Sequence, residues 1–417
     1  MKEPHIAVIG GGQLARMMQE SASALGITLH ALVETPDCAT AQVVVDSIVG
    51  TPQELEKVEK ICAKADVLTY EHEHIPTHVM ETMARKLPVH PGQNALLYAQ
   101  DKIQMRTRLS EAGISCPRFA VVTSPQQLQE KGDELGWPLV VKTPRGGYDG
   151  HGVAVVTHAH DVDTWWRDHD TLLAEQHIAF TREIAVLLAR TPSGEIRHWD
   201  VVETRQKNGM CAEVIAPAQN LDPMMAQKAQ DTGTRIAEIL DVTGVLAVEM
   251  FVIEPDDNDT TTAPALYVNE LAMRPHNSGH WTIDGAVTNQ FEQHLRAVLD
   301  MPLGQTQARS AVTVMLNLLG TQEGSDPRIN YPLVMKHFPS VKIHYYGKGV
   351  RPSRKIGHIC LSGDDVQTVY EEAHRALKAL QQGVSPLGDE ALASSEINTE
   401  TLASGGCGLR EQCEAQQ

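Results

Sequence analysis

Short apolar runs alternate with amphipathic helical segments over the first hundred residues of the chain. Runs rich in β-forming residues occupy positions 5–9, 28–33 and 66–70. Residues 13–25, between the first two runs, have the spacing of a helix that ends at Gly26, and a further helix is expected after Pro76. Strands that alternate with helices in this order predict a parallel, doubly wound sheet.

A glycine-rich segment lies between two predicted strands, 139–142 and 153–156. Four glycines fall between Thr143 and Gly152, in a strand–loop–strand pattern that differs from the strand–loop–helix of a P-loop. Glycines let backbone amides approach phosphate oxygens, and Lys142 at the strand end can reach the same phosphates as a point charge. The segment predicts a flap over phosphates, and a flexible hairpin tip is the alternative.

Two apolar runs near the middle of the chain each carry an acidic residue. Residues 245–253 contain Glu249, and the run from Ala265 leads to Glu270. A buried carboxylate is costly unless it is paired or binds a cation, so two on neighbouring strands could hold Mg²⁺. An ordinary hairpin with solvent-facing acids is the alternative. The turn that follows suits an anion site because it concentrates polar groups: Arg274, His276, Asn277, Ser278 and His280.

Other elements follow from the same patterns. One helix is expected over residues 93–111 and another from Pro125 to Gly136. Further strands are expected near 172–178, 184–190, 197–204 and 211–215, and further helices near 223–240 and 288–299.

A smaller unit is expected after residue 303. It has predicted strands near 311–318, 342–346 and 355–360 and a helix over 364–380. It also carries the densest basic cluster of the chain: Lys342, Lys348, Arg351, Arg354, Lys355 and His358. The cluster suggests an anion site, with a solvated basic face as the alternative. The tail from Gly383 is rich in Ser, Gly and Glu and is expected to be disordered.

Composition and charge narrow the class of protein. The chain has 417 residues, enough for two or three domains, and its formal net charge of −18 argues against a nucleic-acid binder. No apolar stretch is long enough to span a membrane, and the first strand begins too early for a signal peptide. Seven scattered cysteines without a CxxC pair predict reduced thiols rather than disulfides or a zinc site. We therefore expect a cytoplasmic protein.

The turn after the first strand offers an alternative function. Gly10-x-Gly12-x-x-Ala15, with Glu34 after the next strand, fits a loose dinucleotide fingerprint. A nicotinamide-dependent oxidoreductase would use it, but a glycine-rich turn before a helix also suits any phosphate, or is only a tight turn. This function leaves the flap and the two strand acids unexplained.

Together, Lys142, the glycine flap, Glu175 with Glu183, and the pair Glu249 and Glu270 resemble the parts of an ATP-grasp ligase. Over residues 5–385 the chain is more specifically similar to the N5-carboxyaminoimidazole ribonucleotide synthetase family of bacterial and fungal purine synthesis. The motifs that carry the resemblance are GGYDG at 146–150, NELAMRPHNSGHW at 269–281, QFEQHLRA at 290–297 and RPSRKIGH at 351–358, with GGGQLARM at 10–17 and TYEHE at 69–73.

The resemblance implies an ATP-grasp architecture of mixed α/β and α+β class. Its parts would be an N-terminal Rossmann-like parallel-sheet domain over 1–96, a two-part ATP-grasp domain over 97–303 and a small C-terminal domain over 304–385. The glycine-rich flap would belong to a subdomain of about 137–204, and residues 386–417 would form a disordered tail.

The resemblance also implies a reaction. ATP phosphorylates bicarbonate to carboxyphosphate, and the amine of 5-aminoimidazole ribonucleotide (AIR) captures the carboxyl carbon or released CO₂. ATP and Mg²⁺ would be required, the protein would be a homodimer without nucleic-acid or membrane partners, and a separate mutase would receive the product. The alternatives are another ATP-grasp ligase, such as a formate-dependent glycinamide ribonucleotide transformylase, or a nucleotide-binding regulator without turnover.

Roles for individual residues follow from the resemblance. Lys102 and Lys142 would touch the ATP phosphates. The flap residues that would cover them are Gly146, Gly147, Tyr148, Asp149, Gly150, His151 and Gly152. The rest of the ATP site would comprise Glu175, Gln176, His177 and Ile178 at the adenine, Glu183 at the ribose, and Glu203 and Asn269. Glu249 and Glu270 would hold Mg²⁺.

The catalytic side would be lined by residues of the flap, the turn after Glu270 and the basic cluster. Those at bicarbonate and AIR would be Tyr148, Asp149, His151, Arg274, His276 and Asn277. Those at the nucleotide phosphate or carboxyphosphate would be Lys348, Arg351, Arg354 and Lys355. His151 stands where the family's flap usually has arginine, and a histidine cannot fork onto a carboxylate or phosphate. Lys102 stands where some members have arginine.

Overall fold

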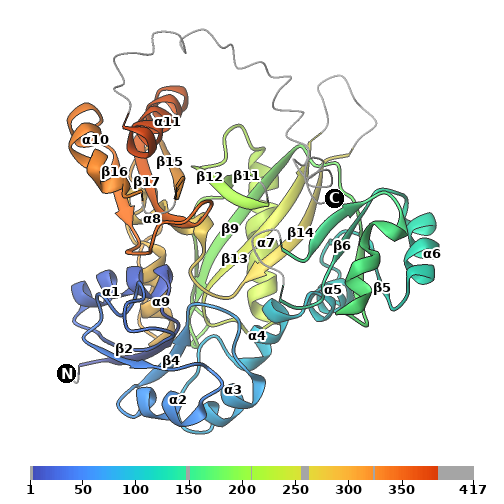
Figure 1. Cartoon of the computed structure of the whole chain (residues 1–417), viewed down its shortest axis with the longest axis horizontal. Helices are drawn as coiled ribbons and strands as arrows, with labels where there is room; N and C mark the ends of the chain where they lie inside the picture. Colours follow the sequence, from blue (N-terminus) through green and yellow to red (C-terminus); the bar gives the residue numbers. More distant parts are fainter. Residues whose placement is uncertain (1–2, 147–150, 208, 255–262, 323–324, 384–417) are drawn as a thin grey trace.

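The computed structural model describes residues 3–146, 151–207, 209–254, 263–322 and 325–383. The central flap residues Gly147, Tyr148, Asp149 and Gly150 and the tail beyond Gly383 lie outside this part of the chain. The described residues form three sheets, which Figure 1 shows with the helices that cover them. None of the described helices is both long and apolar enough to cross a membrane.

The N-terminal sheet is parallel and doubly wound, which confirms the prediction. Its strands lie in the order β3 (Asp46–Val49), β2 (Thr28–Val33), β1 (His5–Ile9) and β4 (Val67–Tyr70). Alternate residues of β1 face two different cores, because Ile6 and Val8 pack with α1 (Gln13–Leu25) while Ala7 and Ile9 pack with α2 (Leu55–Cys62) and α3 (Thr77–Ala84). The turn between β1 and α1 is thereby fixed at the carboxyl edge of this sheet.

The prediction of a single helix over 93–111 is wrong, because the helix is interrupted at Asp101. The structure has α4 (Gln93–Gln100) and α5 (Lys102–Glu111), with Asp101 in an extended conformation between them. The Asp101 carboxylate accepts hydrogen bonds from the backbone N–H groups of Ile103 and Gln104, both at 3.1 Å. Aspartate is a strong N-cap, so it restarts the helix and places Lys102 at its first position.

A small antiparallel sheet follows and carries the base of the flap. Its strands lie in the order β5 (Phe119–Val122), β8 (Leu172–Gln176), β6 (Leu139–Lys142) and β7 (Val153–Val156). The helix α6 (Pro125–Leu135) and the 3₁₀ segment η1 (Ala159–Arg167) pack against it. Ser124 caps α6, and the helix ends at Gly136 as predicted.

The largest sheet has nine strands and combines the middle of the chain with its C-terminal part. Its order is β14 (Ala265–Ala272), β13 (Gly244–Ile253), β9 (Arg182–Arg190), β11 (Val202–Lys207), β12 (Met210–Ala216), β15 (Val312–Leu319), β17 (Lys355–Gly363) and β16 (Lys342–Tyr345), with β10 (Ile196–His198) also paired to β9. The predicted strand 197–204 is therefore two strands. Pairing of β12 with β15 makes the C-terminal strands a continuation of this sheet.

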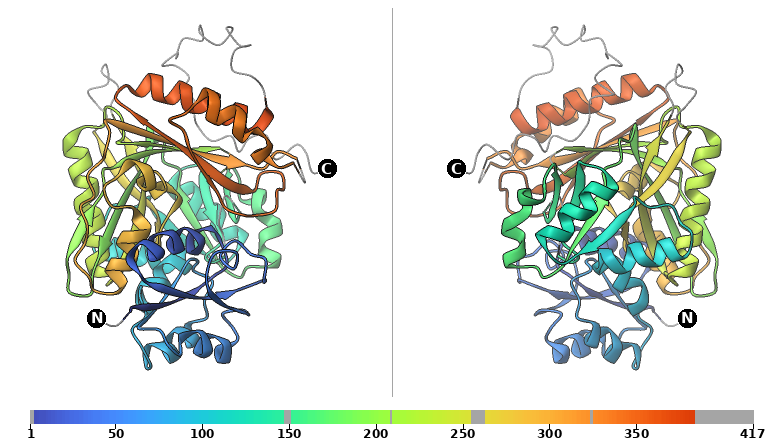
Figure 2. Two further views of the ribbon diagram at one scale, coloured as in Figure 1. Left: turned by 90° about the vertical axis from the view of Figure 1, so that its left-hand side faces the viewer. Right: turned by 90° about the vertical axis from the view of Figure 1, so that its right-hand side faces the viewer.

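Helices cover the large sheet on both faces. α7 (Pro223–Ile239) packs on one face of β9 and β13, and α9 (Gln290–Val298) links the same strands to α1 of the N-terminal sheet. The turn after β14 contains η2 (Asn277–Gly279) and α8 (Thr282–Gly285). Over the C-terminal strands lie η3 (Pro327–Asn330), α10 (Tyr331–His337) and α11 (Val366–Gln382). Figure 2 shows α11 and the N-terminal sheet at opposite ends of the molecule, with the large sheet between them.

Candidate active site

Glu249 and Glu270 lie directly opposite each other in the antiparallel pair of β13 and β14. The register shifts between Glu249 and Met250, where Val268 is the next partner, so Asn269 is an extra residue that forms a β-bulge. Val268 packs into the core beneath α7, and regular alternation would turn Glu270 to the same side. Because Asn269 is an extra residue, Glu270 faces the side of the sheet opposite to Val268, which is the side that Glu249 faces.

The acid pair is suited to a divalent cation. Burial, followed by the negative charge of Glu270, raises the pKa of Glu249 to about 8. The Glu249 carboxyl therefore favours a proton, or a cation that replaces the proton. Mg²⁺ takes one or two protein carboxylates and completes its shell with phosphate oxygens and water, so the donor set fits that ion.

A buried ion network joins the small sheet to β14. The Glu175 carboxylate on β8 receives Arg106 Nε at 2.6 Å through Oε1 and Lys142 Nζ at 2.9 Å through Oε2. Lys142 Nζ also donates to Asn269 Oδ1 at 3.2 Å, and Arg106 Nη2 donates to the Asn269 carbonyl at 2.8 Å. Burial alone would raise the pKa of Glu175, but the charges of Arg106 and Lys142 lower it to about 2. Glu175 thus holds Lys142 in place beside the acid-bearing strand.

The base of the flap is fixed next to Lys102. Lys102 is buried at the start of α5, and its backbone N–H donates to the Pro144 carbonyl at 2.9 Å. Thr143 N–H donates to the Gly152 carbonyl at 2.9 Å, so both ends of the flap are tied together. Gly152 has a φ of 68°, a left-handed conformation that favours glycine. Tyr148 and Asp149 lie outside the described residues, and His151 is at the second edge of the flap.

The polar turn after Glu270 is held between two domains. Arg274 Nε lies 2.9 Å from Glu73 Oε1, a carboxylate that follows β4 of the N-terminal sheet. The buried amide of Gln290 accepts from the His276 N–H at 2.8 Å and donates to the His276 carbonyl at 2.9 Å. His276 Nε2 is thereby placed 3.8 Å from Glu249 Oε1. This turn is therefore part of the same site as the acid pair.

The His276 imidazole is kept neutral. Burial, with the positive charges of Arg274 and Lys355, lowers the pKa of His276 to about 3. Its Nδ1 is 2.9 Å from the Ser278 hydroxyl, which fixes the orientation of the ring. Asn277 Nδ2 is buried without a hydrogen-bond partner among the described residues, so a donor is available to a bound molecule.

The structure divides the predicted basic cluster. Lys355 lies near the acid pair, because its charge lowers the pKa of Glu249 against the effects of burial and of Glu270. Lys348 donates through Nζ to Gln13 Oε1, at the start of α1. Arg351 and Arg354 are exposed on the segment before β17. The site therefore receives Lys355 directly, while Lys348 faces the N-terminal sheet.

The glycine-rich turn before α1 is already occupied by carboxylates. Gly12 N–H donates to Glu71 Oε1, Ala15 N–H donates to Glu71 Oε2 at 2.9 Å, and Gly11 N–H donates to Glu34 Oε2 at 3.1 Å. A pyrophosphate would need these amides at the helix N-terminus. The turn therefore does not favour the dinucleotide-binding alternative.

The other predicted ATP-site residues lie at the ends of β8, β9 and β11. Burial raises the pKa of Glu183 on β9 to about 7. Glu203 Oε1 accepts from Arg205 Nε at 3.0 Å, and its second oxygen is 3.6 Å from Arg182 Nη1. Gln176 Oε1 accepts from Arg118 Nε at 3.0 Å. His177 and Ile178 follow β8, with Ile178 buried.

Sequence reasoning missed Arg106, Glu73 and Gln290 as site residues. Arg106 follows Lys102 by four residues, a spacing that puts both on one face of a helix and that a search for paired basic residues would find. Glu73 and Gln290 lie within motifs that were recognised without a role. Their roles depend on contacts between distant segments, to Arg274 and to the His276 backbone.

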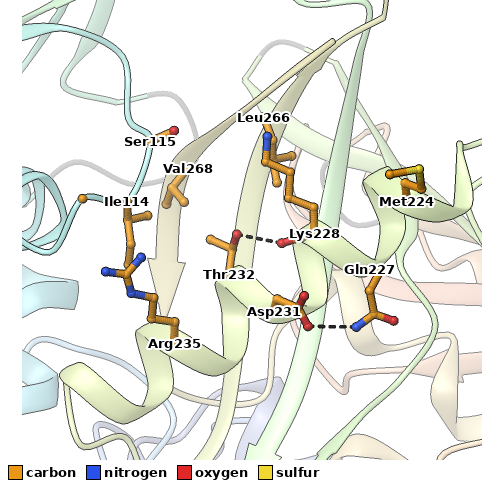
Figure 3. A pocket seen from close by; sticks show the side chains of 11 residues that line it. Ile114, Ser115, Met224, Gln227, Lys228, Asp231, Thr232, Arg235, Leu266 and Val268 are labelled. Carbon is orange, nitrogen blue, oxygen red and sulfur yellow. Dashed lines mark hydrogen bonds between the residues drawn. The ribbon is translucent and has the colours of Figure 1, made fainter.

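A separate cavity of about 450 Å³ lies on the outer side of β14 (Figure 3). Leu266 and Val268 contribute to its lining together with Met224, Lys228 and Arg235. Because Val268 faces away from the acid pair, this cavity is distinct from the site.

Comparisons with known proteins agree with this arrangement. Family models match over residues 1–100 (ribonucleotide synthetase preATP-grasp domain), 107–291 (ATP-grasp domain) and 313–372 (phosphoribosylaminoimidazole carboxylase C-terminal domain). The N5-carboxyaminoimidazole ribonucleotide synthase of Mycobacterium tuberculosis is 44% identical over 389 residues, which cover 91% of this chain and 88% of that protein.

Solved structures show the same likeness. A crystal structure of N5-carboxyaminoimidazole ribonucleotide synthetase in complex with ADP has a TM-score of 0.82 at 32% identity and covers 91% of this chain and 99% of the other. The Aspergillus clavatus N5-carboxyaminoimidazole synthase in complex with ADP and AIR has a TM-score of 0.80 at 29% identity, with the same coverage of both chains.

Proposed function

Because the chain belongs to the N5-carboxyaminoimidazole ribonucleotide synthase family of ATP-grasp ligases, we propose that it uses ATP and bicarbonate to carboxylate the amine of AIR in purine synthesis. The observation that carries this proposal is the facing pair Glu249 and Glu270 next to the buried Lys142–Glu175–Arg106 network. Phosphoryl transfer to a small anion needs this combination of fixed cations and metal-binding acids around crowded phosphates.

The residues of the ATP side would act on the phosphates and the sugar. Lys142, held by Glu175, and Lys102 would neutralise the phosphate oxygens, while Glu183 would accept from the ribose hydroxyls. Glu249 and Glu270 would hold Mg²⁺, which would supply positive charge to the phosphates. Since the Lys142 ammonium is held by Glu175 and Asn269 before ATP arrives, little reorganisation of this group is required in the reaction.

The turn after Glu270 would receive bicarbonate and AIR. Neutral His276 can donate or accept a hydrogen bond without adding charge next to the metal, and Asn277 offers an unsatisfied donor. Arg274 and Lys355 supply the positive charge that a carboxyphosphate requires. The flap, with Tyr148, Asp149 and His151, would exclude water from that labile intermediate.

Several finer points belong to the same proposal. Lys348, Arg351 and Arg354 would bind the nucleotide phosphate of AIR, with Lys348 reaching it from beside Gln13. A homodimer, a cytoplasmic location and transfer of the product to a separate mutase are also proposed, by likeness to the family. Sedimentation of the full chain would measure the oligomeric state.

The decisive experiment measures ADP release with Mg²⁺ and ATP in the presence of bicarbonate, of AIR, and of both. We expect release to rise strongly when both are present and the carboxylated imidazole product to form in equal amount. Formate with glycinamide ribonucleotide in place of bicarbonate and AIR tests the other ligase activity. ADP release that AIR does not change at any bicarbonate concentration would overturn the assignment.

A further inference from the structure

A cluster of two histidines and one aspartate lies outside the active site, where β7 ends and η1 begins. His158 is in an extended conformation with φ −147° and ψ 156°, and His160 and Asp161 follow in the first turn of η1. The imidazole rings of His158 and His160 stack with their centroids 5.1 Å apart. All three side chains are exposed, so solvent ions can reach them.

Local hydrogen bonds fix the Asp161 carboxylate in this cluster. Asp161 Oδ2 accepts from the backbone N–H of Thr157 at 2.8 Å and from that of His158 at 3.0 Å. The other oxygen, Oδ1, is 3.6 Å from His160 Nε2. One carboxylate oxygen therefore serves the backbone while the other is directed at an imidazole nitrogen.

The Thr157 hydroxyl also orients the His158 ring. Its Nδ1 lies 3.0 Å from the Thr157 hydroxyl. In the tautomer that carries the proton on Nδ1, this proton is directed at the Thr157 oxygen and Nε2 keeps the lone pair that a metal needs.

We propose that His158, His160 and Asp161 form a binding site for a divalent transition-metal ion such as Zn²⁺ or Ni²⁺. One ligand atom from each residue lies within 4.8 Å of the others. The ligands of a tetrahedral ion lie roughly 3.4 Å apart, so small rotations of exposed side chains complete the site, with water as a further ligand. Two imidazoles with one carboxylate suit late transition metals, whereas the oxygen pair Glu249 and Glu270 suits Mg²⁺.

The proposed metal site is separate from the chemistry of the flap. In the β6–β7 pair, Lys142 lies opposite Val153 and Leu139 lies opposite Val156. The cluster follows Val156, so it is at the end of the hairpin away from the flap, roughly 10 Å along the strand from Lys142. Metal binding can therefore be tested without disturbing the ATP side.

The test is calorimetric titration of Ni²⁺ into the full chain, in the wild type, in His160→Ala and in the double variant His158→Ala/His160→Ala. His78→Ala is the matched control, because His78 is an exposed histidine on α3. We expect His160→Ala to weaken Ni²⁺ binding by about tenfold or more and the double variant to abolish this binding event.

His78→Ala should bind Ni²⁺ as the wild type does, and Ni²⁺ should raise the melting temperature of both these proteins but not that of the double variant. Circular dichroism without metal confirms that the variants fold. Equal Ni²⁺ affinity in the wild type and the double variant would overturn the proposal, as would an equal loss in His78→Ala.

Discussion

Glu249 lies directly opposite Glu270 across the β13–β14 pair, in a register that is bulged at Asn269, so both acids are on the same face. Burial and the charge of Glu270 raise the pKa of Glu249 to about 8, so an ionised Glu249 carries an electrostatic cost at neutral pH. A divalent cation removes that cost when it binds. The following predictions begin with this pair.

Glu270→Gln should abolish most turnover while leaving the fold intact. Loss of one carboxylate of the proposed metal site removes charge stabilisation worth about 3 kcal/mol, which corresponds to a fall of about a hundredfold in ADP release. Stability without metal should stay equal or rise, because the repulsion with Glu249 is relieved. Steady-state ADP release with AIR and bicarbonate measures the first effect, and thermal unfolding measures the second.

Glu238→Gln, at an exposed position of α7, is the control for the loss of one negative charge. It should leave both measurements unchanged. Near-normal turnover in Glu270→Gln would show that the pair does not hold the metal.

Arg106→Met should destabilise the protein strongly. The substitution leaves the buried Glu175 carboxylate with Lys142 as its remaining ion-pair partner, and breaking one side of a buried ion pair costs about 3 kcal/mol or more. Urea unfolding at neutral pH measures the loss. Arg118→Met is the control, since Arg118 is an exposed arginine whose hydrogen bond to Gln176 lies at the surface. Equal stability of the two variants would contradict a structural role for the network.

The free energy of unfolding should depend on pH partly through the Glu183 carboxyl group. Burial raises the pKa of this carboxyl from 4.5 to about 7, so the folded state favours its protonated form. Its contribution is fully present below pH 4.5 and is lost as the pH rises through about 7. The free energy of unfolding of the wild type should therefore fall relative to Glu183→Gln across that window, by up to roughly 3 kcal/mol.

Urea unfolding at several pH values measures this difference, and groups that titrate in both proteins cancel. Glu56→Gln, at an exposed position of α2, should track the wild type throughout. A difference between the wild type and Glu183→Gln that does not vary with pH would contradict the prediction.

Deletion of Asn269 should keep metal binding but lower stability more than Asn269→Ala does. Without the extra residue Val268 and Glu270 become neighbours in a regular strand, so Val268 stays on the core side and Glu270 stays opposite Glu249. The deletion removes the amide that accepts from Lys142 and the carbonyl that accepts from Arg106, whereas the alanine variant loses only the amide. The melting temperature without metal compares the stability of the two variants, and its Mg²⁺-dependent rise with ATP present tests the acid pair. Loss of this rise in the deletion variant would show that Glu270 no longer lies on the face of Glu249.

Local patterns predicted most elements of the fold but not the features that depend on pairing. The apolar runs around Glu249 and Glu270 identify two strands, because their composition alone favours β-structure. The bulge at Asn269 depends on how the two runs pair, which no single run contains. Similarly, the helical spacing in the sequence continues through Asp101. Only the hydrogen bonds from the backbone N–H groups of Ile103 and Gln104 to the Asp101 carboxylate show that a new helix begins there.

Sequence reasoning identified individual residues of the candidate site more fully than the contacts between them. Lys142 and Glu175 stand out individually, but their ion pair joins segments that are far apart in the chain. The basic cluster seemed a single feature in sequence, yet the fold directs Lys355 toward the acid pair and leaves Arg351 exposed. Proximity along the chain is a poor guide in a loop, because its side chains need not share a face.

The pairing of β12 with β15 has a consequence for how the protein unfolds. Register partners from Glu213 with Leu316 to Ala216 with Thr313 join the C-terminal strands to the sheet that holds Glu249. If β15 separates, it exposes the backbone of both strands as two unpaired edges, which invite association with other chains. The two parts should therefore melt in one transition, with similar hydrogen-exchange protection on both sides of this seam. An excised C-terminal fragment should aggregate where the whole chain does not.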